Sequence, residues 1–244
     1  MQHNKIPILC TRPLSPQLIA LAEENGLQID IVPFIRTESL ESKELSSRIQ
    51  YFSSRSITAV FTSMNAAESV TSQLNGVRPV WRIFCLGNTT RKTLVKYFGE
   101  NSIAGFAENA SALANIIIKT GVVREAVFFC GDHRRDELPK ILVEHRVTVD
   151  EVIVYRTIVL MNKINQHFQG ILFFSPSAVS AFFSSNQISA QTDLFAIGQT
   201  TAEEIKKFTN NTIVVGDKAG KEDLINKMIR YYQSLKKEKI SNRN

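Results

Sequence analysis

Two short motifs occur twice in this chain, in the same order and at nearly the same spacing. FTSMNA at 61–66 aligns with FFSPSA at 173–178, and GNTT at 87–90 aligns with GQTT at 198–201. Ser63 precedes Gly87 by 24 positions and Ser175 precedes Gly198 by 23, so both motifs recur at an offset of 112 or 111 residues. Repetition at a fixed offset indicates a duplicated structural unit. We therefore predict two similar lobes within the 244 residues.

A third, weaker similarity supports the duplication. IDIVPF, which ends at Phe34, resembles VDEVIVY, which ends at Tyr155, and each follows a predicted strand, an arginine-containing turn and a helix. The β-rich run from Val147 to Val159 is too long for an ordinary strand of about 5–6 residues. We expect it to leave one sheet and cross to the other lobe.

Short β-rich runs alternate with amphipathic helical stretches along almost the whole chain. This alternation predicts an α/β fold with parallel sheets that are covered by helices on both faces. The chain is 43% hydrophobic, which suffices for a sizeable core. No apolar run approaches the ~18 residues of a membrane span, and the start lacks a secretory signal, so we expect a cytoplasmic protein without membrane contact.

The net charge is +6, and much of the excess lies in the ending KKEKISNRN, which we interpret as a frayed basic tail. Because no nucleic-acid-binding motif accompanies the charge, we predict no nucleic-acid partner. The positive electrostatic field of the protein would instead assist the encounter with a polyanionic small molecule. The four histidines lack metal-ligand spacing, and no glycine fingerprint for a nucleotide is present, so neither a metal nor a cofactor is expected. Cys10, Cys85 and Cys130 lie in apolar runs and are predicted to be buried.

Each repeated motif places small hydroxyl residues between an apolar strand and a helix. Such residues cap helices, and helix N-termini present free N–H groups that bind carboxylates. Taken singly, each turn is better explained as a helix cap alone; four such turns aimed at one cleft would form a polyanion site. Arg12 and Arg134 follow strands and are candidate carboxylate ligands, and Asp136 is the expected first-turn partner of its helix dipole.

Tyr155 ends the run Val152-Ile153-Val154-Tyr155, where the chain is expected to cross between lobes. A phenol facing a cleft could donate a proton or hydrogen bond to a leaving hydroxyl. The commoner fate of a strand tyrosine is to pack its ring and solvate its hydroxyl. The residues alone leave both interpretations open.

Taken in order, these motifs resemble the uroporphyrinogen-III synthase family over roughly residues 6–231. TRP at 11–13, FTSMNA at 61–66, VYRT at 154–157, SPS at 175–177 and GQTT at 198–201 are similar to the motifs of that family. Met64, Asn88 and Gln199 stand where the family often has proline, so the stiffness of these turns is expected to differ from that in the family.

The resemblance implies two flavodoxin-like lobes joined by a two-stranded connector. The first lobe would combine residues 1–34 and 160–244, the second would span 39–153, and the connector would comprise 35–38 and 154–159. It also implies a cofactor-free monomer that converts hydroxymethylbilane, a linear tetrapyrrole with eight carboxylates, to uroporphyrinogen III, with inversion of the last pyrrole ring and loss of water. A transient contact with the upstream hydroxymethylbilane synthase would fit this role.

By the same resemblance Tyr155 would assist loss of the hydroxyl. The expected substrate-binding residues lie in the repeated turns and in the two arginine-containing turns: Arg12, Thr62, Ser63, Asn65, Thr89, Arg134, Ser175, Ser177, Gly198, Thr200 and Thr201. One alternative is a non-enzymatic two-lobed anion-binding protein, which would bind an anion without consuming it. Another is a nucleotide-dependent transferase or reductase, which the missing glycine fingerprint disfavours.

Overall fold

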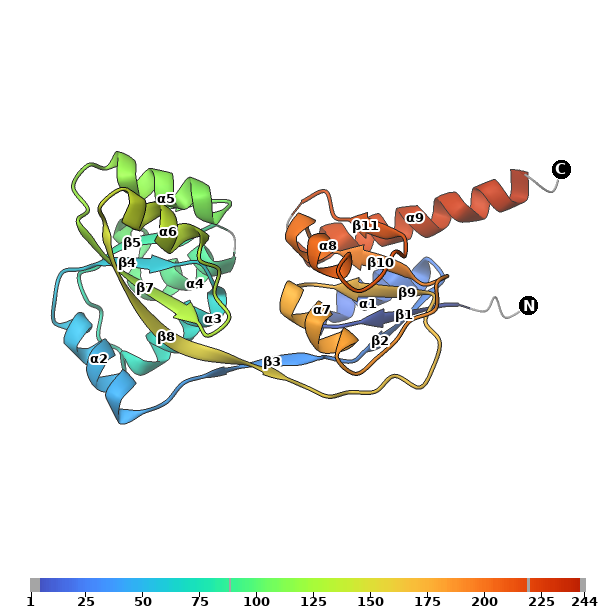
Figure 1. Ribbon diagram of the computed structural model, residues 1–244, viewed down its shortest axis with the longest axis horizontal. Coiled ribbons are helices and arrows are strands. Elements are labelled where there is room, and N and C mark those ends of the chain that lie inside the picture. Colours follow the sequence, from blue (N-terminus) through green and yellow to red (C-terminus); the bar gives the residue numbers. More distant parts are fainter. Residues whose placement is uncertain (1–4, 88, 219, 242–244) are drawn as a thin grey trace. The chain divides into compact units, whose positions relative to one another are not determined.

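A computed structural model describes residues 5–87, 89–218 and 220–241, and the chain divides into two compact units (Figure 1). The terminal unit comprises Met1–Arg36 and Val159–Asn244, and the central unit comprises Thr37–Ile158. Asn88, named above, lies outside the described residues. No helix in the described part of the chain is long and apolar enough to span a membrane.

Within its described residues, the terminal unit contains a five-stranded sheet and four helices. Its strands are β1 (Ile6–Cys10), β2 (Leu27–Ile31), β9 (Gly170–Phe173), β10 (Asp193–Ala196) and β11 (Ile213–Val215), and its helices are α1 (Pro16–Glu24), α7 (Pro176–Phe183), α8 (Gln199–Ile205) and α9 (Lys221–Ser241). Helix α9 continues through most of the sequence interpreted above as a frayed tail, so that interpretation is wrong as far as Ser241. Leu224, Ile225 and Ile229 form the apolar face of α9 and are buried in the core of the terminal unit, which stabilises the helix.

The central unit contains a larger sheet. Its strands are β4 (Thr58–Phe61), β5 (Arg82–Leu86), β6 (Ile103–Ala107), β7 (Glu125–Gly131) and β8 (Thr148–Val159), with β3 (Ile35–Ser39) beside β8; its helices are α2 (Lys43–Ser53), α3 (Met64–Gln73), α4 (Thr89–Phe98), α5 (Ala110–Lys119) and α6 (Glu137–Glu144). The chain changes unit within β3 and near the end of β8. The long β-rich run is therefore one strand of 12 residues that pairs with β7 as far as Tyr155.

The two sheets have the same strand order once the chain connections are permuted. The terminal sheet has the order β11-β10-β9-β1-β2 and the central sheet the order β3-β8-β7-β4-β5-β6. If β7 and β8 are matched with β1 and β2, and β4, β5 and β6 with β9, β10 and β11, both orders become 2-1-3-4-5, which is the flavodoxin-like order, with β3 as an additional edge strand of the central sheet. The structure thus confirms the predicted α/β fold class, and it places both repeated motifs after matching strands.

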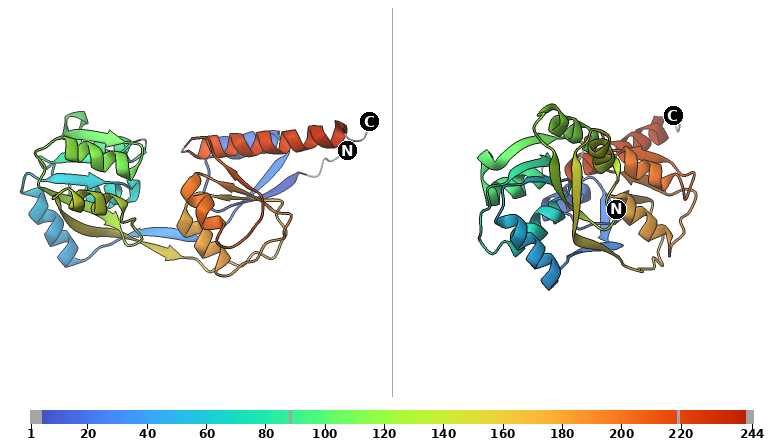
Figure 2. Two further views of the ribbon diagram at one scale, coloured as in Figure 1. Left: turned by 45° about the horizontal axis from the view of Figure 1, so that its top comes forward. Right: turned by 60° about the vertical axis from the view of Figure 1, so that its left-hand side comes forward.

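Helices cover both faces of each sheet, as Figure 2 shows for α9 on one face of the terminal sheet and α7 and α8 on the other. In the central unit, α2, α3 and α4 pack on one face and α5 and α6 on the other. Parallel strands buried on both faces explain runs such as Ala126–Cys130, in which every side chain is buried. The aromatic ring of Phe129 lies at the centre of one core, between Phe61 and Trp81.

Candidate active site

Both FTSMNA and FFSPSA form capped helix starts at the carboxyl ends of matching strands. Ser63 precedes α3, and its hydroxyl oxygen accepts a hydrogen bond of 3.2 Å from the Asn65 amide. Ser175 precedes α7, and its hydroxyl oxygen accepts one of 3.2 Å from the Ala178 amide. These serines therefore do satisfy free amides, as the cap interpretation expects. Thr62, Ser177 and the Asn65 side chain are half-buried beside them.

The two GxTT turns begin α4 and α8. Gly198 precedes α8 with an extended backbone, and Thr200 in its first turn is exposed, as is Thr89 at the start of α4. Thr201, in contrast, is only 2% exposed, and Thr90 is 5% exposed. Of each threonine pair the first member lies at the surface of its unit. The second is enclosed in the core, so the burial of Thr201 argues against the predicted substrate contact through its side chain.

Tyr155 lies over a glycine of the neighbouring strand. Gly131 of β7 pairs with Tyr155 of β8, and the Asp132 amide donates a hydrogen bond of 3.2 Å to the Tyr155 carbonyl oxygen. A Cβ atom at position 131 would lie 2.6 Å from Tyr155 Cε2 and 2.8 Å from its hydroxyl oxygen. Real Cβ atoms do not approach other atoms that closely, so the ring occupies its position only because residue 131 is glycine.

A register shift directs the Tyr155 ring to this place. Cys130 pairs with Ile153, whereas the next residue, Gly131, pairs with Tyr155, so Val154 is the extra residue of a bulge. In a regular strand, Val154 and Tyr155 would point to opposite faces. Because of the bulge, Tyr155 packs against the same core cluster that contains Val154. The ring is thus anchored in the core while its hydroxyl lies near the ends of β4 and β7.

The surroundings of Tyr155 keep its phenol protonated at neutral pH. Burial raises its pKa, and the nearby Cys130 and Asp132 raise it further, whereas the Ser63 hydroxyl lowers it through a hydrogen-bonding interaction. The Ser63 oxygen already accepts the Asn65 amide, so the Ser63 hydroxyl can donate its proton to the tyrosine oxygen. The Tyr155 proton is then available for a ligand. This arrangement can supply a neutral hydrogen-bond or proton donor.

Asp132 and Gly131 are two residues that the sequence interpretation did not identify. Asp132 Oδ1 accepts hydrogen bonds from its neighbour His133, at 2.9 Å, and from the Thr157 amide, at 3.0 Å. It therefore ties the end of β7 to β8 just beyond Tyr155. In the sequence, a glycine followed by an acidic residue at the end of an apolar strand could have marked Gly131 and Asp132 as site residues. Their proximity to Tyr155, however, depends on the pairing of β7 with β8.

Arg134 is less free to bind a ligand than the sequence suggested. Its guanidinium forms ion pairs with Glu151 and with Asp136. Asp136 directly precedes α6 and makes no capping hydrogen bond through its side chain; its carboxylate pairs with Arg134, and its expected interaction with the α6 dipole stays a prediction. An incoming carboxylate at Arg134 would have to replace one of these two acidic partners.

Arg12 in the terminal unit has a different environment. It is exposed after β1, and within the described residues its guanidinium forms no ion pair. Lys221, at the start of α9, donates a hydrogen bond of 2.8 Å to the Pro13 carbonyl oxygen. Burial lowers the Lys221 pKa, and the charge of Arg12 lowers it further, so the two cations lie close enough to repel. A carboxylate bound there would relieve that repulsion, and Lys221 is a candidate that the sequence interpretation missed.

The three cysteines are buried, as predicted, and burial raises each thiol pKa to about 11. Thiols with such pKa values are not nucleophilic at neutral pH. Among the residues that the structure describes, no three His, Cys, Asp or Glu side chains cluster as a metal site would require.

The fold and these turns define a class of protein: two doubly wound α/β units, each with polar turns suited to anions at the carboxyl edge of its sheet. The chain belongs to the uroporphyrinogen-III synthase family, because the family model described as uroporphyrinogen-III synthase HemD matches residues 16–226.

Solved structures agree on the fold. A mutant uroporphyrinogen III synthase from the extremely thermophilic bacterium Thermus thermophilus aligns with a TM-score of 0.68 and 13% identity, over 95% of this chain and 99% of that one. Uroporphyrinogen-III synthetase from Helicobacter pylori aligns with a TM-score of 0.62 and 14% identity, over 93% of this chain and 99% of that one. No curated protein shows a significant sequence match.

Proposed function

We propose that this chain converts hydroxymethylbilane to uroporphyrinogen III as a cofactor-free hydro-lyase. The observation that carries the proposal is the family match over residues 16–226, since the family is that of a lyase in heme biosynthesis. The reaction loses the terminal hydroxyl of the bilane as water and leaves an azafulvene cation. The cation closes onto the substituted carbon of the last pyrrole, and the spiro intermediate fragments and recloses with that ring inverted.

The residues support a mechanism of positioning with one proton donor. Tyr155, kept neutral by burial, would donate a hydrogen bond or proton to the departing hydroxyl, with Ser63 orienting its oxygen. The exposed or half-buried members of the capped turns, together with Arg12, would bind carboxylates through helix N-termini and charge. Folding the bilane so that the correct carbon is attacked is then the main catalytic task. We further propose that the chain acts as a cytoplasmic monomer.

A coupled assay tests this proposal. Hydroxymethylbilane would be generated in the same vessel with and without the protein, and the oxidised uroporphyrin isomers would be separated by chromatography. We expect the type III isomer to predominate when the protein is present. Type I isomer alone from a folded sample would reject the synthase activity and favour the non-enzymatic anion-binding alternative.

Tyr155→Phe should lower turnover by about 10- to 100-fold without abolishing it, because a general acid contributes roughly 10²–10⁴-fold where it is fully required. Initial rates of type III formation measure this effect. The control is Tyr97→Phe, which removes a tyrosine hydroxyl elsewhere in the same unit. This hydroxyl donates a hydrogen bond of 2.9 Å to the Val77 carbonyl oxygen. Full activity in Tyr155→Phe would remove Tyr155 from the mechanism.

Ser63→Ala should lower both stability and turnover, because Ser63 both caps α3 and contacts Tyr155. Asn109→Ala provides the matched control, since Asn109 caps α5 by accepting a 2.8 Å hydrogen bond from Ala112. Each variant should lose about 1 kcal/mol of unfolding free energy in denaturant titrations. Only Ser63→Ala should reduce the rate of type III formation; equal rates in the two variants would limit Ser63 to capping.

A further inference from the structure

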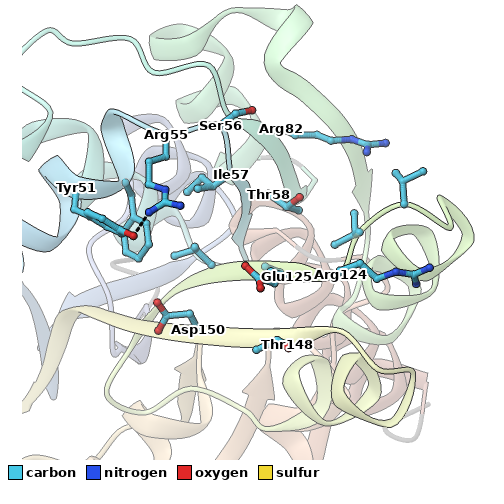
Figure 3. A pocket seen from close by; sticks show the side chains of 15 residues that line it. Tyr51, Arg55, Ser56, Ile57, Thr58, Arg82, Arg124, Glu125, Thr148 and Asp150 are labelled. Carbon is cyan, nitrogen blue, oxygen red and sulfur yellow. Dashed lines mark hydrogen bonds between the residues drawn. The ribbon is translucent and has the colours of Figure 1, made fainter.

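A pocket of about 470 Å³ lies in the central unit at the amino ends of β4, β5, β7 and β8 (Figure 3). The pairs β4–β5, β4–β7 and β7–β8 are all parallel, so these amino ends share one edge of the sheet. Tyr155 and Ser63 lie at the opposite, carboxyl edge. The pocket is therefore separate from the candidate active site, and its volume falls in the range of small-molecule sites, roughly 300–1,000 Å³.

Three arginines surround this pocket without carboxylate partners. In Figure 3, Arg82 and Arg124 lie on one side and Arg55 on the other. Arg55 bonds to the Tyr51 hydroxyl and lies over its ring, and Arg82 lies 5.6 Å from the centre of the Phe84 ring. Across the described ranges of the chain, none of the three arginines forms an ion pair.

The acidic side chains of the pocket do not balance this charge. Asp150 is already paired with Arg48, which leaves Glu125 as the one lining carboxylate, among the described residues, without an ion-pair partner. The lining has three guanidinium groups and two carboxylates, and because Arg48, outside the lining, neutralises Asp150, the local charge balance is +2. Guanidinium groups bind carboxylate and phosphate in a bidentate manner, so an anion is the ligand that these groups favour.

The rest of the lining is apolar with a few hydroxyl groups. Ile57, Val122 and Val123 provide an apolar surface, and Thr58 and Thr148 provide hydroxyl groups. Val122, in the loop before β7, is 64% exposed. A ligand with an apolar body would bury this surface while its charged groups reach the arginines.

The matching edge of the terminal unit shows that the fold does not itself require such a pocket. In the central unit the first pair of β4 and β5 is Thr58 with Arg82; in the terminal unit the first pair of β9 and β10 is Gly170 with Asp193. There the Tyr231 hydroxyl donates to Asp193 at 2.8 Å, and the Tyr232 hydroxyl lies close over Gly170.

Helix α9 thus closes that edge of the terminal sheet with two tyrosines. The counterpart of α9 in the central unit is α5, but α5 has 10 residues where α9 has 21, so it ends before the positions that Tyr231 and Tyr232 occupy in α9. The central sheet also carries arginine where the terminal sheet has aspartate. The two units therefore share one architecture but differ at the amino ends of their strands. In the terminal unit α9 covers these ends, and in the central unit they form a basic pocket.

We propose that the amino edge of the central sheet is a binding site for a small organic anion that carries carboxylate or phosphate groups on an apolar body. The anionic groups pair with Arg82, Arg124 and Arg55, and the apolar body covers Val122 and Ile57. This site is independent of the synthase reaction proposed above, since it shares no residue with the carboxyl edge.

The test uses phenyl phosphate and phthalate as probes of the full chain, with amide chemical shifts and calorimetry as readouts. We expect saturable binding of one probe molecule with a dissociation constant below about 1 mM. The shift changes should be confined to the neighbourhood of 56–58, 122–126 and 148. Preference for phenyl phosphate or for phthalate then identifies the anionic group as phosphate or carboxylate.

Arg82→Gln and Arg124→Gln should each weaken binding about tenfold, because each removes a bidentate partner. Arg78→Gln is the matched control, since Arg78 is exposed in the same unit and does not line the pocket; its affinity should equal that of the unmodified chain. The site would be refuted by the absence of localised shifts up to about 10 mM probe, or by equal binding of neutral benzyl alcohol. A response only to a polyglutamate peptide would overturn the small-molecule assignment in favour of an acidic protein segment.

Discussion

Phe129→Ala is expected to lower the unfolding free energy of the central unit by about 3–5 kcal/mol. Phe129 is fully buried, and its ring stacks on Phe61, with centroids 5.1 Å apart, and on Trp81, with centroids 5.5 Å apart. It also meets the edge of Phe52 at 6.1 Å. Truncation to alanine removes the buried ring and leaves a cavity that three neighbouring aromatic rings would have to fill.

Because all these contacts lie within the central unit, the loss should appear as a lower melting temperature for that unit alone, measured by calorimetry. Phe106→Ala is the control: Phe106 belongs to the same unit but is 52% exposed, and its ring contact is with Arg91 at 4.5 Å. We expect a cost of at most about 1 kcal/mol there. Equal losses in the two variants would contradict the assigned core.

Gly131→Ala is expected to displace the Tyr155 ring and to reduce type III formation at least as much as Tyr155→Phe does. The added Cβ atom would lie 2.6 Å from Tyr155 Cε2, and the ring cannot turn away without leaving the core cluster against which it packs. Overpacking of this kind costs about 1–3 kcal/mol of stability. Denaturant titration and the coupled isomer assay measure the two effects.

A double-mutant cycle isolates the contact. In a Tyr155→Ala background the ring is gone, so Gly131→Ala should then cost little stability, and the coupling energy should approach the cost of Gly131→Ala in the unmodified chain. If Gly131→Ala destabilises both backgrounds equally, the glycine is required for another reason, and the proposed close approach is incorrect.

The features that the sequence determined by itself are those that depend on near neighbours along the chain. The alternation of apolar strands and amphipathic helices predicted the α/β fold, and the repeated FTSMNA and GNTT turns predicted two similar units. Ser63 and Ser175 cap helices where their motifs indicated, because a cap needs only the next two or three residues.

The local sequence did not predict which side chains of those motifs are buried. Thr200 and Thr201 are adjacent and chemically identical, yet one is exposed and the other is in the core, because the direction of each side chain depends on how α8 packs on the sheet. The partners of Arg134 were hidden for a similar reason, since Glu151 reaches it from the neighbouring strand, 17 residues away in the sequence.

The environment of Tyr155 was decided by tertiary structure. The run Val152-Ile153-Val154-Tyr155 alternates, so the sequence places Tyr155 on the face opposite Val154. The bulge between β7 and β8 instead turns the ring toward Gly131 and Ser63. Strand register is a long-range property that local sequence does not fix. Composition and motif order thus determined the fold class and the family, whereas the pairing of β7 with β8 decided which groups surround the phenol.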